Sequence, residues 1–176
     1  MDALLLTFGH GTADRERIIS LLQGARVEAV VDVRIAPGSR RDPELSRHRL
    51  VKWLPDHGIA YRWEPGLGGF RRPPPDSPDT VWRNYSFRGY AAYTRTRPFV
   101  TAMDELLRQA AEIRTTVMCG EALWWRCHRR LIADFSVLAR GVPASHLLHD
   151  GRISAHTVTP GARLREDGLL VYDGAV

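Results

Sequence analysis

One short segment, residues 119–130, concentrates the reactive side chains of this chain and reads CGEALWWRCHRR. We predict that Cys127 lies at the start of a helix, where free N–H groups and a partial positive charge lower a thiol pKa and attract anions. His128 or Glu121 can move protons, and Arg129 offers paired donors for phosphate or carboxylate. The segment therefore predicts a cysteine nucleophile or redox thiol beside a bound anion.

The same residues also have structural interpretations. Cys119 is expected at the end of a buried strand, where cysteine is commonly an inert small hydrophobe. Glu121 can pair with an arginine, and His128 and Arg129 can form salt bridges along a helix. Both interpretations stay open, with Cys127, His128, Glu121 and Cys119 as the catalytic candidates.

Zinc is a further use for these side chains. Cys119, Cys127 and His128, with His10 or His146, include the ligand types that zinc prefers. However, adjacent residues 127 and 128 rarely face one ion from a regular helix, and the chain has no Cys-x-x-Cys pair. We therefore predict no cofactor and keep zinc as a less favoured alternative. Dinucleotide-binding and P-loop fingerprints are missing, which argues against a nicotinamide or ATP enzyme.

Alternating strands and helices must position these residues. Strands are predicted at 3–8, 27–33, 59–63, 115–118 and 143–148, and helices at 14–24, 43–56, 97–113 and 127–139. This order predicts a single α/β domain over residues 1–176, a three-layer Rossmann-like fold with a mostly parallel five-stranded sheet. A hairpin near 168–172 forms a C-terminal β extension. The Gly-, Pro- and Arg-rich stretch 64–88 is predicted to be a long loop and a mobile lid.

Polar residues follow three of the predicted strands. Ligands of such sheets bind beyond the carboxyl ends of the strands, so we expect these residues around one cleft. They are His10 and Thr12, Asp32 and Arg34, and Cys119 and Glu121.

Structural roles compete at these positions too. Thr12 is a plausible N-cap of the first helix, and His10 can cap the same helix. Asp32 and Arg34 can form an ion pair that holds two loops. Arg88 and Tyr90, at the end of the long loop, can close over a ligand or serve in packing.

Composition limits the class of protein. With 176 residues, 44% hydrophobic and 26% charged, the chain is typical of one globular domain, and no apolar run is long enough to span a membrane. We expect a cytoplasmic protein with reduced thiols. The net charge of +5, carried by arginine everywhere except Lys52, favours an anionic small molecule or nucleotide as partner. Nucleic acid is a weaker alternative, and the oligomeric state is not indicated.

Several motifs together resemble the DUF488 family, whose function is largely unassigned. They are Gly9-His10-Gly11, Asp32-Val33-Arg34, Pro37-Gly38-Ser39-Arg40, Leu67-Gly68-Gly69, Phe87-Arg88-Gly89-Tyr90-Ala91-Ala92-Tyr93, Cys119 with Cys127-His128-Arg129, Leu131-Ile132-Ala133, and His146. The chain departs from the family pattern at Gly11-Thr12, where a serine is usual, and at Trp124-Trp125, where a proline is common. The resemblance implies an α/β domain but no reaction.

The leading hypothesis is an enzyme of nucleotide or nucleic-acid metabolism, a hydrolase or transferase. Its anionic substrate would be bound by Arg34, Arg88 and Arg129, with a cysteine as nucleophile. One alternative is a non-catalytic module that binds nucleotides or nucleic acid in the same pocket. Another is a metal-binding stress-response protein.

Overall fold

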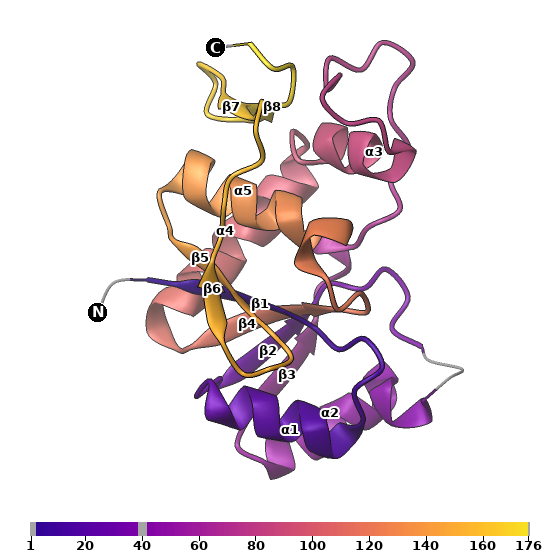
Figure 1. The fold of residues 1–176 in the computed structure, drawn as a ribbon, viewed down its shortest axis with the longest axis vertical. Helices are drawn as coiled ribbons and strands as arrows, with labels where there is room; N and C mark the ends of the chain where they lie inside the picture. Colours follow the sequence, from indigo (N-terminus) through magenta and orange to yellow (C-terminus); the bar gives the residue numbers. More distant parts are fainter. Residues whose placement is uncertain (1–2, 39–41, 176) are drawn as a thin grey trace.

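A central sheet lies between helices in the computed structural model of the protein, which describes residues 3–38 and 42–175 (Figure 1). Its strand order is β3-β2-β4-β1-β5-β6. The bounds are β1 (Leu5–Gly9), β2 (Ala29–Asp32), β3 (Ala60–Trp63), β4 (Thr115–Cys119), β5 (Ala144–Leu147) and β6 (Ile153–Ala155). β1 to β5 are parallel, whereas β6 pairs antiparallel with β5. The prediction of five strands is wrong, because β6 adds a sixth strand at the edge of the sheet. In the pairing of β6 with β5, Ile153 lies opposite Leu147.

The central strands are apolar because both of their faces are covered. Every residue of β1, β2 and β4 is buried. Successive side chains of a strand point to opposite faces. Accordingly, Leu5 of β1 belongs to one hydrophobic core and Leu6 and Phe8 belong to the other.

Helices cover both faces of the sheet, as expected for three layers (Figure 1). One core contains residues of α1 and α2, and the other contains residues of α3, α4 and α5. The helices are α1 (Arg15–Gly24), α2 (Arg47–Asp56), α3 (Tyr85–Tyr93), α4 (Arg97–Glu112) and α5 (Arg129–Arg140), with short 3-10 turns η1 (Pro43–Leu45), η2 (Pro65–Leu67) and η3 (Trp124–Arg126). No helix in the described part of the chain is long and apolar enough to cross a membrane. The three-layer Rossmann-like prediction is confirmed.

The N-cap of α1 differs from the prediction. Asp14, not Thr12, caps the helix, since its side chain accepts a hydrogen bond from the Arg17 amide at 2.9 Å. Thr12 is exposed in the preceding turn. Asp14 is the residue directly before α1, and this is the position from which a carboxylate reaches the free amides of the first turn.

The predicted loop 64–88 is shorter than expected, because α3 begins at Tyr85. Asn84 caps this helix by accepting a hydrogen bond from the Phe87 amide at 3.1 Å. The sequence signal for α3 was weak, since the helix has nine residues and contains Gly89. A Cβ at Gly89 would lie 1.8 Å from the Arg71 carbonyl oxygen, so the backbone of the irregular stretch packs directly on the helix.

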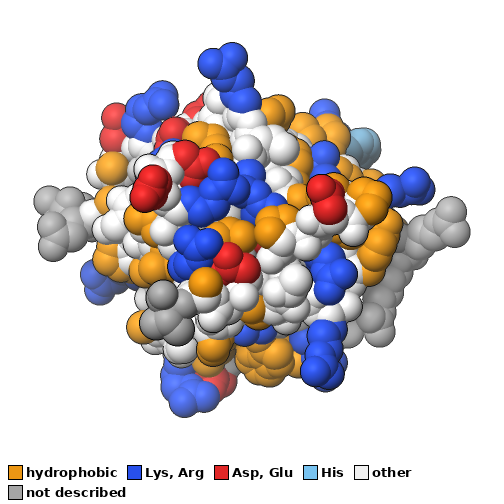
Figure 2. Space-filling model, turned by 90° about the horizontal axis from the view of Figure 1, so that it is seen from above, with side chains coloured by type: hydrophobic (Ala, Val, Ile, Leu, Met, Phe, Trp, Pro, Cys, Tyr) orange, Lys and Arg blue, Asp and Glu red, His pale blue; other side chains and the backbone are white. Residues whose placement is uncertain are grey.

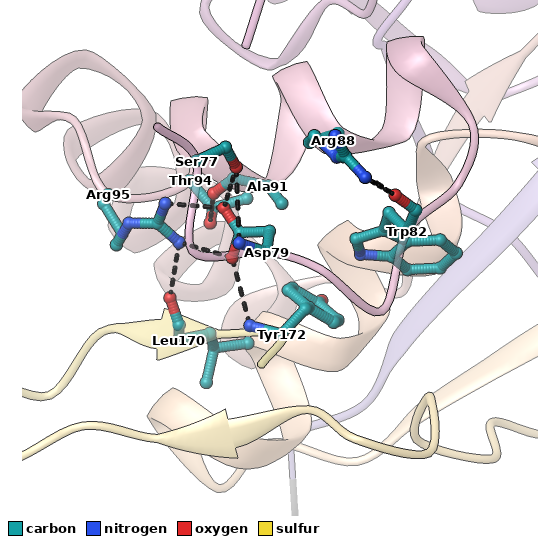
Figure 3. Close-up of polar contacts among 9 residues, drawn as sticks. All are labelled: Ser77, Asp79, Trp82, Arg88, Ala91, Thr94, Arg95, Leu170 and Tyr172. Carbon is teal, nitrogen blue, oxygen red and sulfur yellow. Dashed lines mark hydrogen bonds and ion pairs between the residues drawn. The ribbon is translucent and has the colours of Figure 1, made fainter. Parts of the chain in front are cut away.

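The irregular stretch is also fastened to the end of the chain (Figure 3). Asp79 is fully buried and accepts two hydrogen bonds from the Arg95 guanidinium, at 2.9 and 2.6 Å. The Tyr172 amide donates to the same carboxylate at 3.0 Å. These contacts favour a structural role for this part of the chain over a mobile lid. Of the motif Pro37-Gly38-Ser39-Arg40, Ser39 and Arg40 lie outside the described residues.

The end of the chain forms the predicted hairpin. β7 (Arg163–Leu164) pairs antiparallel with β8 (Leu170–Val171) as a separate two-stranded sheet. β8 leads into Tyr172, which packs against Trp82 with ring centroids 5.3 Å apart. The hairpin therefore covers the α3–α5 side of the molecule.

Candidate functional site

After two neighbouring strands, β1 and β4, the chain turns toward opposite faces of the sheet. β1 lies beside β4, with Gly9 opposite Cys119. The helix after β1 is α1, whereas the helix after β4 is α5, on the other face. Such a change of direction opens a crevice at the carboxyl ends of the strands, where α/β proteins bind ligands.

A pocket of about 480 Å³ lies at this edge of the sheet, within the usual size for small-molecule sites. It is bordered by the loops after β2 and β4, by residues 69–70, and by the start of α3. The lining residues are Arg34, Ile35, Ala36, Gly69, Phe70, Asn84, Ser86, Phe87, Tyr90, Cys119, Gly120, Glu121, Arg126, Cys127 and His128. All four catalytic candidates are therefore among them.

Two of the lining residues are cysteines whose thiols lie against each other. Cys119 ends β4, and the η3 turn brings the chain back so that Cys127 lies against it, with the Sγ atoms 2.6 Å apart. Cys119 is 2% exposed and Cys127 6% exposed. Cys127 precedes the helix, since α5 begins at Arg129 with His128 as its N-cap.

A buried positive charge accompanies the thiols. Arg129 is 1% exposed and has no carboxylate partner among the described residues. Its Nε donates to the Cys119 Sγ at 3.0 Å, and its other nitrogens donate to Thr7 Oγ1 and to the carbonyls of Glu121 and Ala122. A buried charge is costly without a counter-charge, and a thiolate in the adjacent pair supplies one.

The surroundings shift the pKa values of the two thiols in opposite directions. Burial raises the pKa of Cys127, but the hydrogen bond from Cys119 and the charge and amide of Arg129 outweigh it, so this pKa falls to about 7. Burial and the neighbouring Cys127 hold the pKa of Cys119 well above its ordinary value. The pair therefore acquires its first negative charge near pH 7, on Cys127, with Cys119 as the hydrogen-bond donor.

His128 is oriented as a proton acceptor for Cys127. Its Nε2 lies 2.8 Å from the Val33 carbonyl oxygen, which can only accept, so Nε2 carries the hydrogen. Nδ1 then has a free lone pair, 3.4 Å from the Cys127 Sγ. Burial lowers the pKa of His128, which keeps the ring neutral, so that Nδ1 can accept a hydrogen bond from the Cys127 thiol. Gly69 packs against the ring, since a Cβ there would lie 3.1 Å from Nδ1.

Asp32 and Arg34 form the predicted ion pair. Arg34 donates from Nε and Nη2 to the fully buried Asp32 carboxylate, at 2.9 and 2.7 Å. The Tyr61 hydroxyl donates to the same carboxylate at 2.6 Å. Arg34 still borders the pocket, but its charge is already neutralised by Asp32.

The other predicted site residues divide into two groups. Tyr90 lines the pocket, edge-on to His128, and Glu121 lines it with a carboxylate that also accepts from the Leu123 amide at 3.1 Å. His10, Thr12, Arg88 and Arg129 do not line the pocket. His10 lies next to it, with Nε2 3.6 Å from where a Cβ of Gly120 would be, and it donates from Nδ1 to the Gly11 carbonyl.

Two arginines that we predicted as anion ligands have other partners. Arg88 donates from Nε and Nη2 to the Trp82 carbonyl, at 3.1 and 2.8 Å (Figure 3). Arg129 points into the protein toward Cys119. Periodicity can place an arginine at the end of a helix, but it cannot tell whether its long side chain turns outward or inward.

A network of buried, hydrogen-bonded side chains continues from Arg129 into the core. This network was not predicted from the sequence. Arg129 donates to Thr7 Oγ1 at 3.1 Å, and Thr7 lies 2.5 Å from His146 Nδ1. His146 Nε2 lies 2.8 Å from His156 Nδ1, and His156 Nε2 lies 2.7 Å from the Asp134 carboxylate. With His146 neutral, these hydrogen bonds can all run from the Arg129 guanidinium toward the Asp134 carboxylate. Asp134 therefore opposes the charge of Arg129 across this network of hydrogen-bonded side chains.

The neighbours of His146 hold it neutral. Its ring stacks on Trp124 at 4.2 Å with an angle of 2°. Burial and the adjacent His156 lower its pKa to about 3. The sequence did contain one signal, a histidine inside the apolar strand β5, because a polar group on a buried strand must find a partner.

Replacing Gly9 with alanine is expected to destabilise the protein by roughly 1–3 kcal/mol, the usual cost of overpacking. The new Cβ would lie 1.8 Å from the Glu121 carbonyl oxygen and 2.6 Å from Arg129 Nη2. Urea unfolding would measure the loss. Gly24→Ala is the control, because nothing lies within 4 Å of its added Cβ. Equal urea midpoints of unfolding for the two variants would contradict the close approach of Gly9 to the Glu121 carbonyl.

Candidate metal ligands do not converge in the part of the chain that the structure describes. Across residues 3–38 and 42–175, no group of three or more His, Cys, Asp and Glu side chains is arranged to hold a metal ion. The zinc hypothesis therefore lacks a ligand cluster in this part of the chain.

The fold and pocket define a Rossmann-like α/β protein with a thiol pair beyond the carboxyl end of its sheet. Comparison with protein families then identifies the chain: the model of the domain of unknown function DUF488 matches residues 14–136, and the chain belongs to this family. The match confirms the resemblance seen in the motifs. No curated protein and no solved structure matches the chain.

Proposed function

We propose that this protein is an enzyme that uses Cys127 as a nucleophile on a small anionic, nucleotide-related substrate. One observation carries the proposal: Cys127 lines the pocket, and its Sγ lies 2.6 Å from the Cys119 Sγ and 3.4 Å from His128 Nδ1. Nucleophilic cysteines need a lowered pKa or an adjacent base, and this site supplies both. In the reaction, His128 would take the thiol proton while Cys127 attacks the electrophilic centre.

The side chains that line the pocket favour a ligand that has both an anionic group and a flat ring. Arg126 lines the pocket and is exposed, and its guanidinium has no hydrogen bond or ion pair with the side chains or backbone of the other described residues. Ser86, in the first turn of α3, adds a hydroxyl and lies where helix amides attract negative charge. Phe70 and Phe87 offer aromatic faces on which a nucleobase can stack. Phe70 is 82% exposed at the mouth, so it is available to a ligand.

A long nucleic acid fits the face of the molecule seen in Figure 2 less well. On the face seen in Figure 2, arginine side chains alternate with acidic and apolar ones and form no continuous basic stripe. Polymeric nucleic acid is usually bound along such a stripe. This observation favours a small ligand, either as substrate or as the ligand of a non-catalytic module.

Protection from alkylation tests the proposal. Nucleoside monophosphates and inorganic phosphate are screened for slowing the modification of Cys127 by iodoacetamide. We expect a nucleotide to protect, and Arg126→Ala to weaken that protection by about tenfold or more, since charge-assisted hydrogen bonds contribute roughly 1.5–3 kcal/mol. Arg108→Ala is the matched control, because this exposed arginine of α4 does not line the pocket.

Two results would count against the proposal. The anion-binding role fails if no phosphate compound protects Cys127, or if Arg126→Ala and Arg108→Ala behave alike. The catalytic role fails if protecting nucleotides are never converted by the wild-type protein. In the second case the binding module becomes the better account.

A further inference from the structure

We propose that Cys119 and Cys127 form a redox-active pair that cycles between two thiols and a disulfide, so that the pocket catalyses a two-electron reduction. This inference rests on the proposed role of Cys127 as the nucleophile and adds a second reaction, on a second class of substrate, at the same site. Both sulfur atoms border the pocket, and they are 2.6 Å apart. A disulfide bond is about 2.05 Å long, so the two sulfur atoms already lie within reach of bond formation.

The surroundings assign different roles to the two thiols. Cys127 is the attacking thiol, because it lies beside the lone pair of His128 and its pKa is lowered to about 7. Cys119 is the resolving thiol, because its raised pKa keeps it protonated while Cys127 reacts. Arg129 donates to the Cys119 sulfur at 3.0 Å and would stabilise this sulfur as a thiolate when Cys119 in turn attacks.

The low exposure of Cys127 limits which oxidised compounds can reach its sulfur atom. With Cys127 only 6% exposed, a bulky protein disulfide cannot approach its sulfur, whereas a compact hydroperoxide group can. The pocket of about 480 Å³ leaves room for the rest of a small organic hydroperoxide above the thiols. Hydrogen peroxide presents the same O–O bond without an organic part, and the experiment below separates the two sources.

The reaction balances in two steps. The Cys127 thiolate, whose proton His128 has taken, attacks one oxygen of the hydroperoxide: the S–O bond forms, the O–O bond breaks, and the departing alkoxide takes the proton from His128 and leaves as an alcohol. Cys119 then attacks the Cys127 sulfenic acid: the S–S bond forms, the S–O bond breaks, and hydroxide leaves as water with the Cys119 proton. The two thiols lose two electrons, and the hydroperoxide gains them. An external thiol restores the pair by thiol–disulfide exchange.

The test treats the reduced protein with one equivalent of tert-butyl hydroperoxide or hydrogen peroxide, in the presence of dimedone, which traps sulfenic acids. In the wild type we expect a disulfide between residues 119 and 127, seen as the loss of two hydrogens by mass spectrometry and reversed by dithiothreitol. Cys119→Ser should instead collect a dimedone adduct on Cys127. Cys127→Ser should leave the hydroperoxide unconsumed. Faster consumption of the organic compound would indicate an organic substrate, and faster consumption of hydrogen peroxide the free peroxide.

Iodoacetamide labelling of the same samples separates this inference from the proposed function. If Cys127 labels rapidly but the wild type forms no disulfide, or collects as much dimedone as Cys119→Ser, the redox pair is overturned and the nucleophile stands. If Cys127 reacts with neither reagent, both proposals fail.

Discussion

Asp134→Ala is expected to destabilise the protein by about 3–5 kcal/mol, the range found when one partner of a buried charged network is removed. The Asp134 carboxylate is fully buried and accepts three hydrogen bonds. They come from His156 Nε2 at 2.7 Å, from the Tyr172 hydroxyl at 2.7 Å and from the Thr159 amide at 3.0 Å. Alanine would leave all three donors without a partner in the core, and each unsatisfied group is costly.

Urea unfolding followed by circular dichroism measures this loss. The control is Asp104→Ala, which removes a carboxylate bound to Arg140 at 2.7 Å near the surface. Exposed pairs of this kind contribute at most about 1 kcal/mol. If Asp134→Ala unfolds at the same urea concentration as Asp104→Ala, the buried network from Arg129 to Asp134 does not stabilise the protein as we infer.

The sheet could be predicted because its strands carry their own pattern. The β-branched run ending at Asp32 and the apolar run ending at Cys119 are typical of parallel strands covered on both faces. β6 and α3 could not be predicted, because their stability comes from tertiary contacts. β6 has three exposed residues and is held by its pairing with β5. In α3, Gly89 lowers helix propensity, and the contact with Arg71 that requires it cannot be seen in the sequence.

The candidate site could be predicted only in part. Cys119, Glu121 and Cys127 are close in sequence and follow a strand, so topology alone places them at one edge of the sheet. The direction of Arg129 depends on its buried acceptors, the Cys119 sulfur, the Thr7 hydroxyl and the carbonyls after β4, which sequence spacing does not reveal. Asp134 and its histidine partner are separated by 22 residues and lie on different elements, so no local pattern connects them.

Cys127 is expected to be the rapidly alkylated thiol of the native protein. At pH 7 a thiol with a pKa of about 7 is half ionised, whereas one at the ordinary value of 9.0 is about 1% ionised. The thiolate advantage is therefore on the order of 50-fold. Cys127→Ser should remove nearly all rapid labelling by iodoacetamide, because burial keeps the pKa of Cys119 high. Cys119→Ser should retain labelling at Cys127, and equal, slow labelling of both cysteines would contradict the assignment.

The central claim is that the pocket holds Cys127 as a thiolate near neutral pH. The most direct measurement is the rate of iodoacetamide modification at Cys127, followed by peptide mass spectrometry from about pH 5 to about pH 10, in native and urea-unfolded protein. Because the thiolate is the reactive form, the rate should rise with pH and level off above the pKa. We predict a native midpoint at about pH 7, well below that of the unfolded chain. A native midpoint equal to or above the unfolded one would contradict the claim.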